Sequence, residues 1–285
     1  MMNMDNSKKL VGILGYPLSH SLSPVMQNMA FKYYNLNNVY VPIEVKPEDL
    51  EIIVKAIRGM NFIGFNVTVP HKIEVVKYLD EMDKLAELIG AVNTVVVKDG
   101  NLKGYNTDGI GFLKSFQENT NESIEGKRVF ILGAGGASRA VSMTLAMNKA
   151  EKVYICNRTY EKAERLSQDI NTKIGNVSAA VPMEYEKMKE VIYDSDVFIN
   201  TTTVGMHPNV DESPIDRSLL HENLILCDIV YNPRKTKLLE EAEELGCKTV
   251  PGLSMLVYQG AESFRLWTGM EAPVDIMFKA VENIS

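Results

Sequence analysis

Four short polar blocks in the first half of the chain carry the side chains best suited to chemistry. Hydroxyl and amide groups dominate them, and each stands at an end of a predicted strand, where pockets form in open sheets. Groups of this kind can fix a polyhydroxylated carboxylate, and a hydride transfer to a carbonyl also needs a proton donor. The blocks are Ser19–Pro24, Asn66–Lys72, Gly90–Thr94 and Gly104–Gly109.

A glycine-rich turn in the second half is typical of dinucleotide binding. The apolar run Val129–Leu132 leads into it, and an amphipathic helical segment follows with apolar residues at helical spacing. Glycines there allow a tight turn and a close approach of the backbone to a pyrophosphate. The alternative is a glycine turn with a purely structural role. The cofactor residues predicted at this turn are Gly133, Ala134, Gly135, Gly136 and Ala137.

The tip of the next predicted strand indicates NADP rather than NAD. NAD sites usually place an acid there for the ribose 2′-hydroxyl, whereas arginine suits the 2′-phosphate of NADP. This strand ends in Asn157-Arg158-Thr159, and Lys162 adds a positive charge one turn later. The alternative is that Thr159 only caps a helix and Arg158 is a solvated surface charge.

The elements that position these residues divide the chain into two parts. The first half alternates strands and helices and then shows a hairpin around Asp99-Gly100, which predicts mixed parallel and antiparallel pairing. From residue 127, helical segments alternate with strands expected at Arg128–Leu132, Lys152–Cys156, Val197–Asn200 and Leu224–Ile229. This alternation predicts a parallel, doubly wound sheet of the Rossmann type. We expect an α/β protein with a substrate domain of residues 1–108 plus 252–285, whose C-terminal helices return to it, and an NADP domain of residues 109–251.

Composition excludes several classes of protein. The 285 residues carry a formal net charge of -7, which argues against binding nucleic acid or anionic membranes through a broad positive surface. The 3 cysteines have no pair spacing, and the 4 histidines have no ligand spacing, so neither a disulfide framework nor a metal is expected. Without a spanning segment or signal peptide, a cytoplasmic protein is the default prediction.

These linked motifs resemble those of the shikimate dehydrogenase family. The likeness runs from about Val11 to Gly269 and includes Val204-Gly205-Met206, Asp228–Pro233 and Val257–Glu262. The resemblance implies two domains closing on a cleft and a reversible, NADP-dependent reduction of 3-dehydroshikimate to shikimate, in the route to chorismate and the aromatic amino acids.

The resemblance also implies roles for individual residues. Lys72 and Asp108 would be the catalytic pair that handles the proton; read from the residues alone, they would be a surface lysine and a helix cap. The nicotinamide pocket would be lined by Ile229, Gly252 and Met255. The substrate would be bound by Ser19, Ser21, Thr68, Lys72, Asn93, Asp108, Tyr231 and Gln259.

Two rival interpretations remain open. A quinate/shikimate dehydrogenase that uses NAD is disfavoured by Ser19 and by the absence of an acid directly after Arg158. A non-catalytic dinucleotide sensor on the same fold would not need the pair Lys72 and Asp108. Lys84 lies where several family members carry an acid, so no role is assigned to it. The partner is expected to be a small molecule, and the chain a monomer or homodimer.

Overall fold

The computed structural model describes residues 8–18 and 21–282. Its contacts divide the chain into two compact units. The first unit contains the residues up to Thr107 and those from Gln259 onward, and the second is Asp108–Tyr258. Helix α9 (Gly252–Thr268) contributes residues to both. The functional domain limits of 1–108 plus 252–285 and 109–251 stay a prediction.

The first unit is built on a six-stranded mixed sheet with the strand order β2-β1-β3-β5-β6-β4. Strand β1 pairs in parallel with β2 and β3, whereas β5 pairs antiparallel with β3 and β6. This mixture confirms the expected pairing. The strands are β1 (Lys9–Gly15), β2 (Asn38–Glu44), β3 (Phe62–Val67), β4 (Glu81–Met82), β5 (Thr94–Lys98) and β6 (Asn101–Tyr105).

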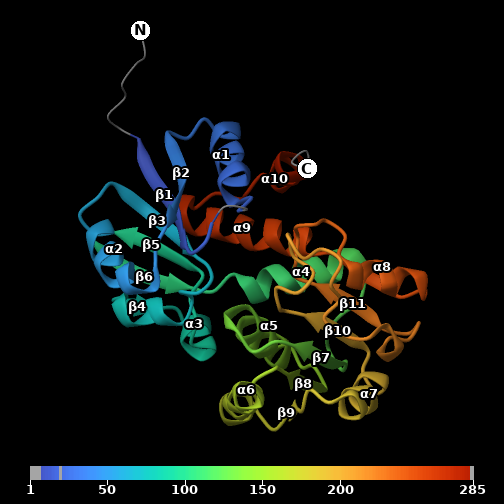
Figure 1. Ribbon diagram of the computed structural model, residues 1–285. Helices are drawn as coiled ribbons and strands as arrows, with labels where there is room; N and C mark the ends of the chain where they lie inside the picture. The colour runs from blue at the N-terminus through green and yellow to red at the C-terminus, as the bar shows by residue number, and fades with distance from the viewer. Residues whose placement is uncertain (1–7, 19–20, 283–285) are drawn as a thin grey trace. The chain divides into compact units, whose positions relative to one another are not determined.

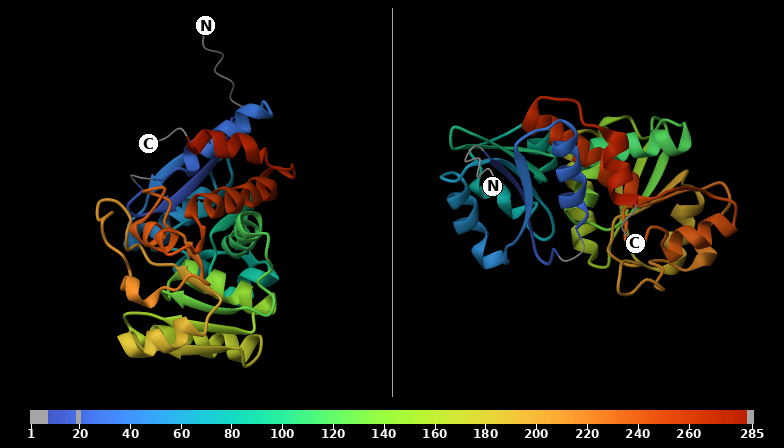
Figure 2. Two further views of the ribbon diagram at one scale, coloured as in Figure 1. Left: turned by 90° about the vertical axis from the view of Figure 1, so that its right-hand side faces the viewer. Right: turned by 90° about the horizontal axis from the view of Figure 1, so that it is seen from above.

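Helices pack on this sheet because their apolar faces match its buried side chains. On one side α2 places Leu50, Val54 and Ile57 in a core with Phe65 and Val95. The first and last helices of the unit pack against each other: α1, in blue, lies beside α10, in red (Figure 2). The helical segments of this unit, besides part of α9, are α1 (Ser23–Tyr33), η1 (Pro47–Asp49), α2 (Leu50–Ile57), η2 (Glu74–Tyr78), α3 (Lys84–Ile89) and α10 (Val274–Glu282).

Ser23 followed by Pro24 predicts a helix that has Ser23 as its N-cap and reaches about Leu36. Helix α1 differs from this prediction at both ends. Ser23 was expected as the N-cap, but Leu22 takes that position with helical backbone angles, and its carbonyl oxygen accepts the first-turn bond from the Met26 amide at 3.2 Å. The helix ends at Tyr33 rather than near Leu36, because Asn35 adopts a left-handed conformation with φ of 53°.

The hairpin signal in the first unit is confirmed. Asp99 and Gly100 have φ of 52° and 77°, and they join β5 to β6 with Lys98 opposite Asn101. Two consecutive positive φ values are what a type I′ turn requires. The turn aligns β5 and β6 so that Thr94 lies opposite Tyr105, directly before the fourth polar block's Asn106.

The second unit is a doubly wound Rossmann sheet, as expected. Its strands are all parallel in the order β12-β11-β10-β7-β8-β9, so the order reverses between β7 and β10. Ligands of such sheets bind outside the carboxyl ends of the strands at this switch point. The strands are β7 (Arg128–Leu132), β8 (Lys152–Cys156), β9 (Ser178–Val181), β10 (Val197–Asn200), β11 (Ile225–Asp228) and β12 (Lys248–Val250).

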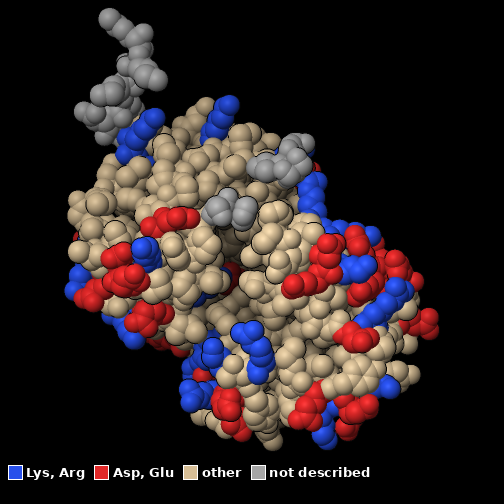
Figure 3. All heavy atoms as spheres, viewed as in Figure 1, with Lys and Arg blue, Asp and Glu red and all other residues tan. Residues whose placement is uncertain are grey.

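Helices cover both faces of the second sheet. In Figure 1, α5 and α6 lie on one face and α7 and α8 on the other, as right-handed crossovers require. Acidic side chains gather over α8, interleaved with basic ones, on the face drawn in Figure 3. The helical segments are α4 (Asp108–Thr120), α5 (Gly136–Met147), α6 (Tyr160–Lys173), α7 (Tyr185–Tyr193), η3 (Arg217–Leu219) and α8 (Lys237–Glu244).

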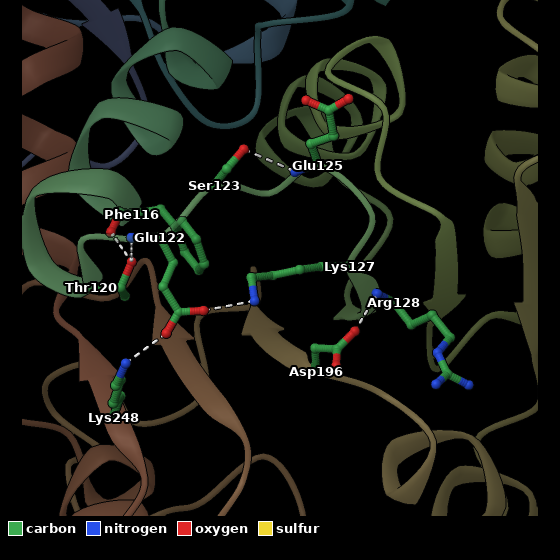
Figure 4. A network of polar contacts seen from close by, with 9 residues as sticks. All are labelled: Phe116, Thr120, Glu122, Ser123, Glu125, Lys127, Arg128, Asp196 and Lys248. Carbon is green, nitrogen blue, oxygen red and sulfur yellow. Dashed lines mark hydrogen bonds and ion pairs between the residues drawn. The ribbon is translucent and has the colours of Figure 1, made fainter.

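An ionic bridge holds the connector that follows α4. The Glu122 carboxylate accepts from Lys127 at 2.7 Å and from Lys248 in β12 at 2.6 Å (Figure 4). The Thr120 hydroxyl, which donates to the Phe116 carbonyl at 2.7 Å, accepts from the Glu122 amide. The end of α4, the start of β7 and β12 are therefore joined through one side chain.

Candidate functional site

A buried hydrogen-bonded network centred on Asn93 occupies the strand ends of the first unit. The Asn93 side chain is 2% exposed. Its Nδ2 donates to Thr107 Oγ1 at 2.9 Å and to Gln259 Oε1 at 3.4 Å, and its Oδ1 accepts from the Thr107 amide at 2.8 Å. The structure therefore brings together Asn93 and Gln259, two of the predicted substrate-binding residues, although they are 166 positions apart.

A second layer of polar side chains supports this network, and sequence reasoning gave it no role. Asn66 donates to the Asn93 carbonyl oxygen at 3.0 Å and to Ser263 Oγ at 3.1 Å, and it accepts from the Tyr40 hydroxyl at 2.7 Å. Ser263 in turn donates to the Gln259 carbonyl oxygen at 3.0 Å. Asn66 begins the second polar block of the sequence, but its hydrogen-bond partners Tyr40 and Ser263 come from distant segments.

Lys72 lies in the turn after β3 and is half-buried. Its carbonyl oxygen accepts from the Val92 amide at 2.8 Å, which fixes its backbone next to Asn93. The neighbouring His71 is 1% exposed, and its Nε2 lies 2.6 Å from the Val45 carbonyl oxygen. His71 therefore has a structural partner for that ring nitrogen and holds the turn in which Lys72 stands.

Two further predicted substrate residues lie in the first unit. Thr68 is half-buried, and its backbone is held between Leu14 and His71 by bonds of 2.8 Å each. Ser21 lines a hollow of about 360 Å³ with Leu18 and Glu44 among its other walls. The predicted partner Ser19 lies outside the described residues, so its position is not assigned.

The glycine-rich turn joins β7 to α5 at the switch point of the second sheet. Gly133 has φ of +117°, and a β-carbon there would lie 2.4 Å from Thr201 Oγ1, so only glycine fits. A β-carbon on Gly135 would meet nothing within 4 Å. Gly135 caps α5 without any side-chain bond, and the first turn of α5 carries no acid. Open space before uncapped amide groups fits the pyrophosphate of a dinucleotide.

Ala134, Gly136 and Ala137 belong to the same turn and helix start. The turn is held from both sides: the Gly133 amide donates to the Cys156 carbonyl oxygen at 2.7 Å, and the Ser138 hydroxyl donates to the Gly133 carbonyl oxygen at 2.7 Å. These bonds use the internal side of the turn. The predicted loop is therefore present in the strand–turn–helix context that dinucleotide binding requires.

The tip of β8 presents the residues predicted for the 2′-phosphate. Arg158, Thr159 and Lys162 are exposed there, and the Asn157 amide group donates to the Thr159 carbonyl oxygen at 2.9 Å. Thr159 occupies the N-cap position of α6, but its side chain makes no capping bond. Arg158 and Lys162 place two positive charges at the tip of β8, and such a pair suits a phosphate dianion.

Residues predicted around the nicotinamide lie after β11 and at the start of α9. Gly252 packs so tightly that a β-carbon would lie 2.5 Å from the Val230 carbonyl oxygen and 2.6 Å from that of Ile229. The structure thus brings Gly252 to Ile229. Met255 is 7% exposed, within the next turn of α9. Tyr231 is half-buried, and burial raises the pKa of its hydroxyl.

Asp108 begins α4 and is buried. It directly follows Thr107, whose amide and hydroxyl both bond to Asn93 Oδ1, at 2.8 and 3.2 Å. Val92 therefore holds the backbone of Lys72, and its neighbour Asn93 holds Thr107. The joint action of Lys72 and Asp108 as a catalytic pair stays a prediction.

The described residues contain no cluster of three or more His, Cys, Asp or Glu side chains placed to hold a metal ion. A hollow of about 510 Å³ lies at the amino-terminal edge of the second sheet, between Arg128 and His221, at the end opposite the glycine turn.

Within residues 8–18 and 21–282, no helix combines the length and apolar character needed to cross a membrane.

Comparison with known proteins supplies independent evidence. Residues 13–95 match the model of the shikimate dehydrogenase substrate binding domain, 115–254 that of shikimate / quinate 5-dehydrogenase, and 252–282 that of the shikimate 5′-dehydrogenase C-terminal domain. The chain is 47% identical to a shikimate dehydrogenase (NADP(+)) of Methanopyrus kandleri over 98% of this chain and 97% of the relative.

Solved structures agree with the sequence matches. A crystal structure of a shikimate dehydrogenase in complex with NADP+ aligns with a TM-score of 0.91 and 42% identity, covering 99% of this chain and 97% of that one. A quinate dehydrogenase from Corynebacterium glutamicum in complex with NAD aligns with a TM-score of 0.88 and 31% identity, covering 96% and 98%. With its family models covering most of its length, the chain belongs to the shikimate dehydrogenase family.

Proposed function

We propose that this protein is an NADP-dependent shikimate dehydrogenase that reversibly reduces 3-dehydroshikimate to shikimate. Two hydrogen bonds carry the proposal. The Val92 amide donates to the Lys72 carbonyl oxygen, and the Asn93 side chain accepts from the amide of Thr107, the residue before Asp108. A hydride transfer to a carbonyl needs a proton donor close to the developing alkoxide. The family assignment provides the matching reaction.

The substrate is held by hydroxyl and amide groups of the first unit. Thr68, Asn93 and Gln259 hydrogen-bond the ring hydroxyls or the carboxylate, and Ser21 binds the carboxylate together with Ser19. Asn93 and Gln259 support this role because one hydrogen bond joins their side chains within a rigid network. Tyr231 is a further substrate-binding residue in this proposal. A pre-formed polar set of this kind costs little ordering when the substrate binds.

The nicotinamide supplies the hydride that is added to the carbonyl carbon at C3. The Lys72 ammonium donates one proton to the carbonyl oxygen as the new C–H bond forms, so the carbonyl gains one hydride and one proton. In the oxidative direction, Lys72 takes the proton from the hydroxyl. Asp108 orients the ammonium and balances its charge.

The cofactor is NADP. Residues of the turn, Gly133 to Ala137, hold the pyrophosphate against the start of α5, and the side chains at the tip of β8 hold the 2′-phosphate. The support is the uncapped helix start with open space at Gly135 and the absence of an acid between Cys156 and Tyr160. Ile229, Gly252 and Met255 form the nicotinamide side of the site.

Initial rates of cofactor reduction test this proposal in a two-by-two design, with shikimate or quinate and NADP or NAD. Strong turnover only with shikimate and NADP supports it. Comparable turnover of quinate with NAD favours the quinate dehydrogenase interpretation, which the likeness to the Corynebacterium enzyme motivates. NADP binding with no turnover in any combination leaves the sensor interpretation.

The cellular location and the oligomeric state are two further predictions. We expect the enzyme to act in the cytoplasm, as a monomer or a homodimer. Light scattering coupled to gel filtration measures the assembly, and fractionation of the source cells measures the location.

A further inference from the structure

A buried carboxylate at the carboxyl end of β11 takes no part in the proposed chemistry. Asp228 is 2% exposed, and its neighbour in the sheet register, Asn200 at the end of β10, is 0% exposed. Charged side chains are rarely buried to this degree without an opposite charge. Packing alone therefore does not explain why a carboxylate occupies this position.

The carboxylate is satisfied by donors from three segments. Its Oδ1 accepts from Asn200 Nδ2 and from the Val230 amide, each at 3.0 Å, and its Oδ2 accepts from Thr236 Oγ1 at 2.7 Å. Thr236 is also the N-cap of α8. The loop between β11 and α8, which carries Ile229 and Tyr231, is thus closed at both ends on one carboxylate.

The network continues from Asp228 toward the glycine-rich turn. Asn200 Oδ1 accepts from the Thr202 hydroxyl at 2.7 Å, and the adjacent Thr201 hydroxyl donates to the carbonyl oxygen of Leu132, the last residue of β7, at 2.7 Å. Thr201 is also the residue that a β-carbon on Gly133 would strike. The loops after β7, β10 and β11 are therefore fixed relative to one another.

On the other side, the network reaches the start of α9. The backbone of Ile229 and Val230 lies against Gly252, where even one β-carbon would have to displace it. Any movement of the Val230 amide away from Asp228 must therefore move the loop relative to Gly252. Ile229, Tyr231 and Gly252 are residues of the proposed site, which Asp228 itself does not enter.

We propose that Asp228 is a positioning residue, which fixes the Ile229–Tyr231 loop against Gly252 and the Asn200–Thr202 turn so that nicotinamide and substrate meet a pre-formed surface. This inference rests on the proposed function. It assigns Asp228 no contact with the reactants. Its effect passes through the hydrogen bond to the Val230 amide and through Asn200.

The carboxylate form is the one that accepts all these bonds. Burial raises its pKa to about 6. The groups around it are uncharged at neutral pH: the Asn200 amide, the Val230 N–H and the Thr236 hydroxyl donate to it, and the buried Cys227 thiol precedes it in β11, with its own pKa raised. When Asp228 is protonated, one of its oxygens carries a hydrogen, so the bond in which the Thr236 hydroxyl donates to Oδ2 must reverse its direction or be lost.

Asp228→Asn tests the inference without removing the side chain. The amide oxygen can accept at the Oδ1 position, but the NH₂ group faces Thr236, as in the protonated acid. We expect the KM for shikimate of the variant at pH 7.5 to rise several-fold and to stay flat between pH 5 and 7.5. In the wild-type protein the KM should rise to the same level as the pH falls through about 6.

Asp228→Ala removes every acceptor and leaves three donors unpaired. We expect kcat/KM for shikimate to fall about 10- to 100-fold, the range expected for lost bonds to a charged group. NADPH fluorescence titration gives a readout apart from turnover. Its Kd should change less than the shikimate KM, because the substitution replaces no residue of the proposed 2′-phosphate or pyrophosphate sites. If this variant does not fold, Asp228→Asn decides alone.

Asp196→Asn is the matched control. Asp196 lies at the opposite end of β10 and accepts from the Arg128 amide at 2.7 Å, as Figure 4 shows. The control should keep the wild-type KM and pH profile. The inference is overturned if Asp228→Asn keeps the wild-type pH dependence of KM, or if a folded Asp228→Ala keeps kcat/KM. Absence of turnover in the wild-type protein would instead overturn the proposed function.

Discussion

Gly109 lies so close to Thr144 that a β-carbon on the glycine would stand 1.9 Å from the threonine Oγ1. This contact brings the first turn of α4 against α5, the helix that follows the glycine-rich turn. The backbone at Asp108 is thereby set by helix packing on the dinucleotide-binding element. The two helices can approach this closely because Gly109 has no side chain.

Gly109→Ala should therefore destabilise the protein by about 1–3 kcal/mol, the usual cost of overpacking, and lower kcat by displacing Asp108. Urea unfolding and initial rates measure the two effects. Thr144→Ala removes the hydroxyl but leaves the β-carbon 2.7 Å away, so the double variant should recover part of the loss. Strict additivity of the two changes would contradict the contact.

Lys72→Ala should lower kcat by at least ~10²-fold, a typical share for a general acid, with little change in the NADPH Kd. Steady-state rates and fluorescence titration provide the measurement. Lys77→Ala is the control, since its ion pair with Glu74 is exposed and contributes little. An unaltered kcat for Lys72→Ala would remove this residue from the mechanism.

Arg158→Ala should raise the KM for NADP by about tenfold or more and leave the KM for NAD nearly unchanged, because only NADP carries the 2′-phosphate. Arg165, exposed on α6, provides a matched arginine-to-alanine control. Equal changes in both KM values would show that Arg158 does not bind the 2′-phosphate.

Glu122→Gln should reduce the free energy of unfolding at pH 7 by up to about 1 kcal/mol, since the pair is partly exposed. Hydrogen bonds from Lys127 and Lys248 lower the pKa of Glu122. A lowered folded-state pKa contributes stability above the ordinary glutamate value of about 4.3, and this contribution is lost as pH falls through the folded-state value. Chemical denaturation across pH 3–7 should show the difference between variant and wild type shrinking in acid.

The neighbouring Glu125 provides the control for that experiment. It pairs with Lys149 at 3.0 Å, and both side chains are largely exposed. Glu125→Gln should leave stability unchanged at every pH. An equal loss in both variants would show that the Glu122 bridge has no special part in holding the connector.

Asp228→Asn should stabilise the folded protein at pH 7 while it impairs substrate binding. The pKa of Asp228 is raised to about 6, so the folded state binds its proton more tightly than the unfolded chain. The contribution of this group to stability therefore decreases as pH rises from about 4 to 6, and the asparagine variant should lack that slope. Thermal unfolding measured from pH 4 to 7 checks the sign, and a variant less stable than wild type at pH 7 would contradict it.

Local patterns in the sequence determined the elements of this protein. The apolar runs of β7, β8 and β10 were predicted to the residue, because buried parallel strands bounded by turns leave a clear signal. Asp99-Gly100 fixed the hairpin through its positive φ values. The glycine turn and the tip of β8 were recognisable because a phosphate site depends on short, contiguous backbone geometry.

Only the tertiary structure decided which distant groups meet. The bond of Asn93 to Gln259, the support from Asn66 and Ser263, and the donors on Asp228 join residues that no local period relates. The end of α1 was mispredicted because a left-handed Asn35 outweighed helix propensity. Hydrogen bonds between buried polar groups are selected when the chain packs, since each such group must then find a partner away from water.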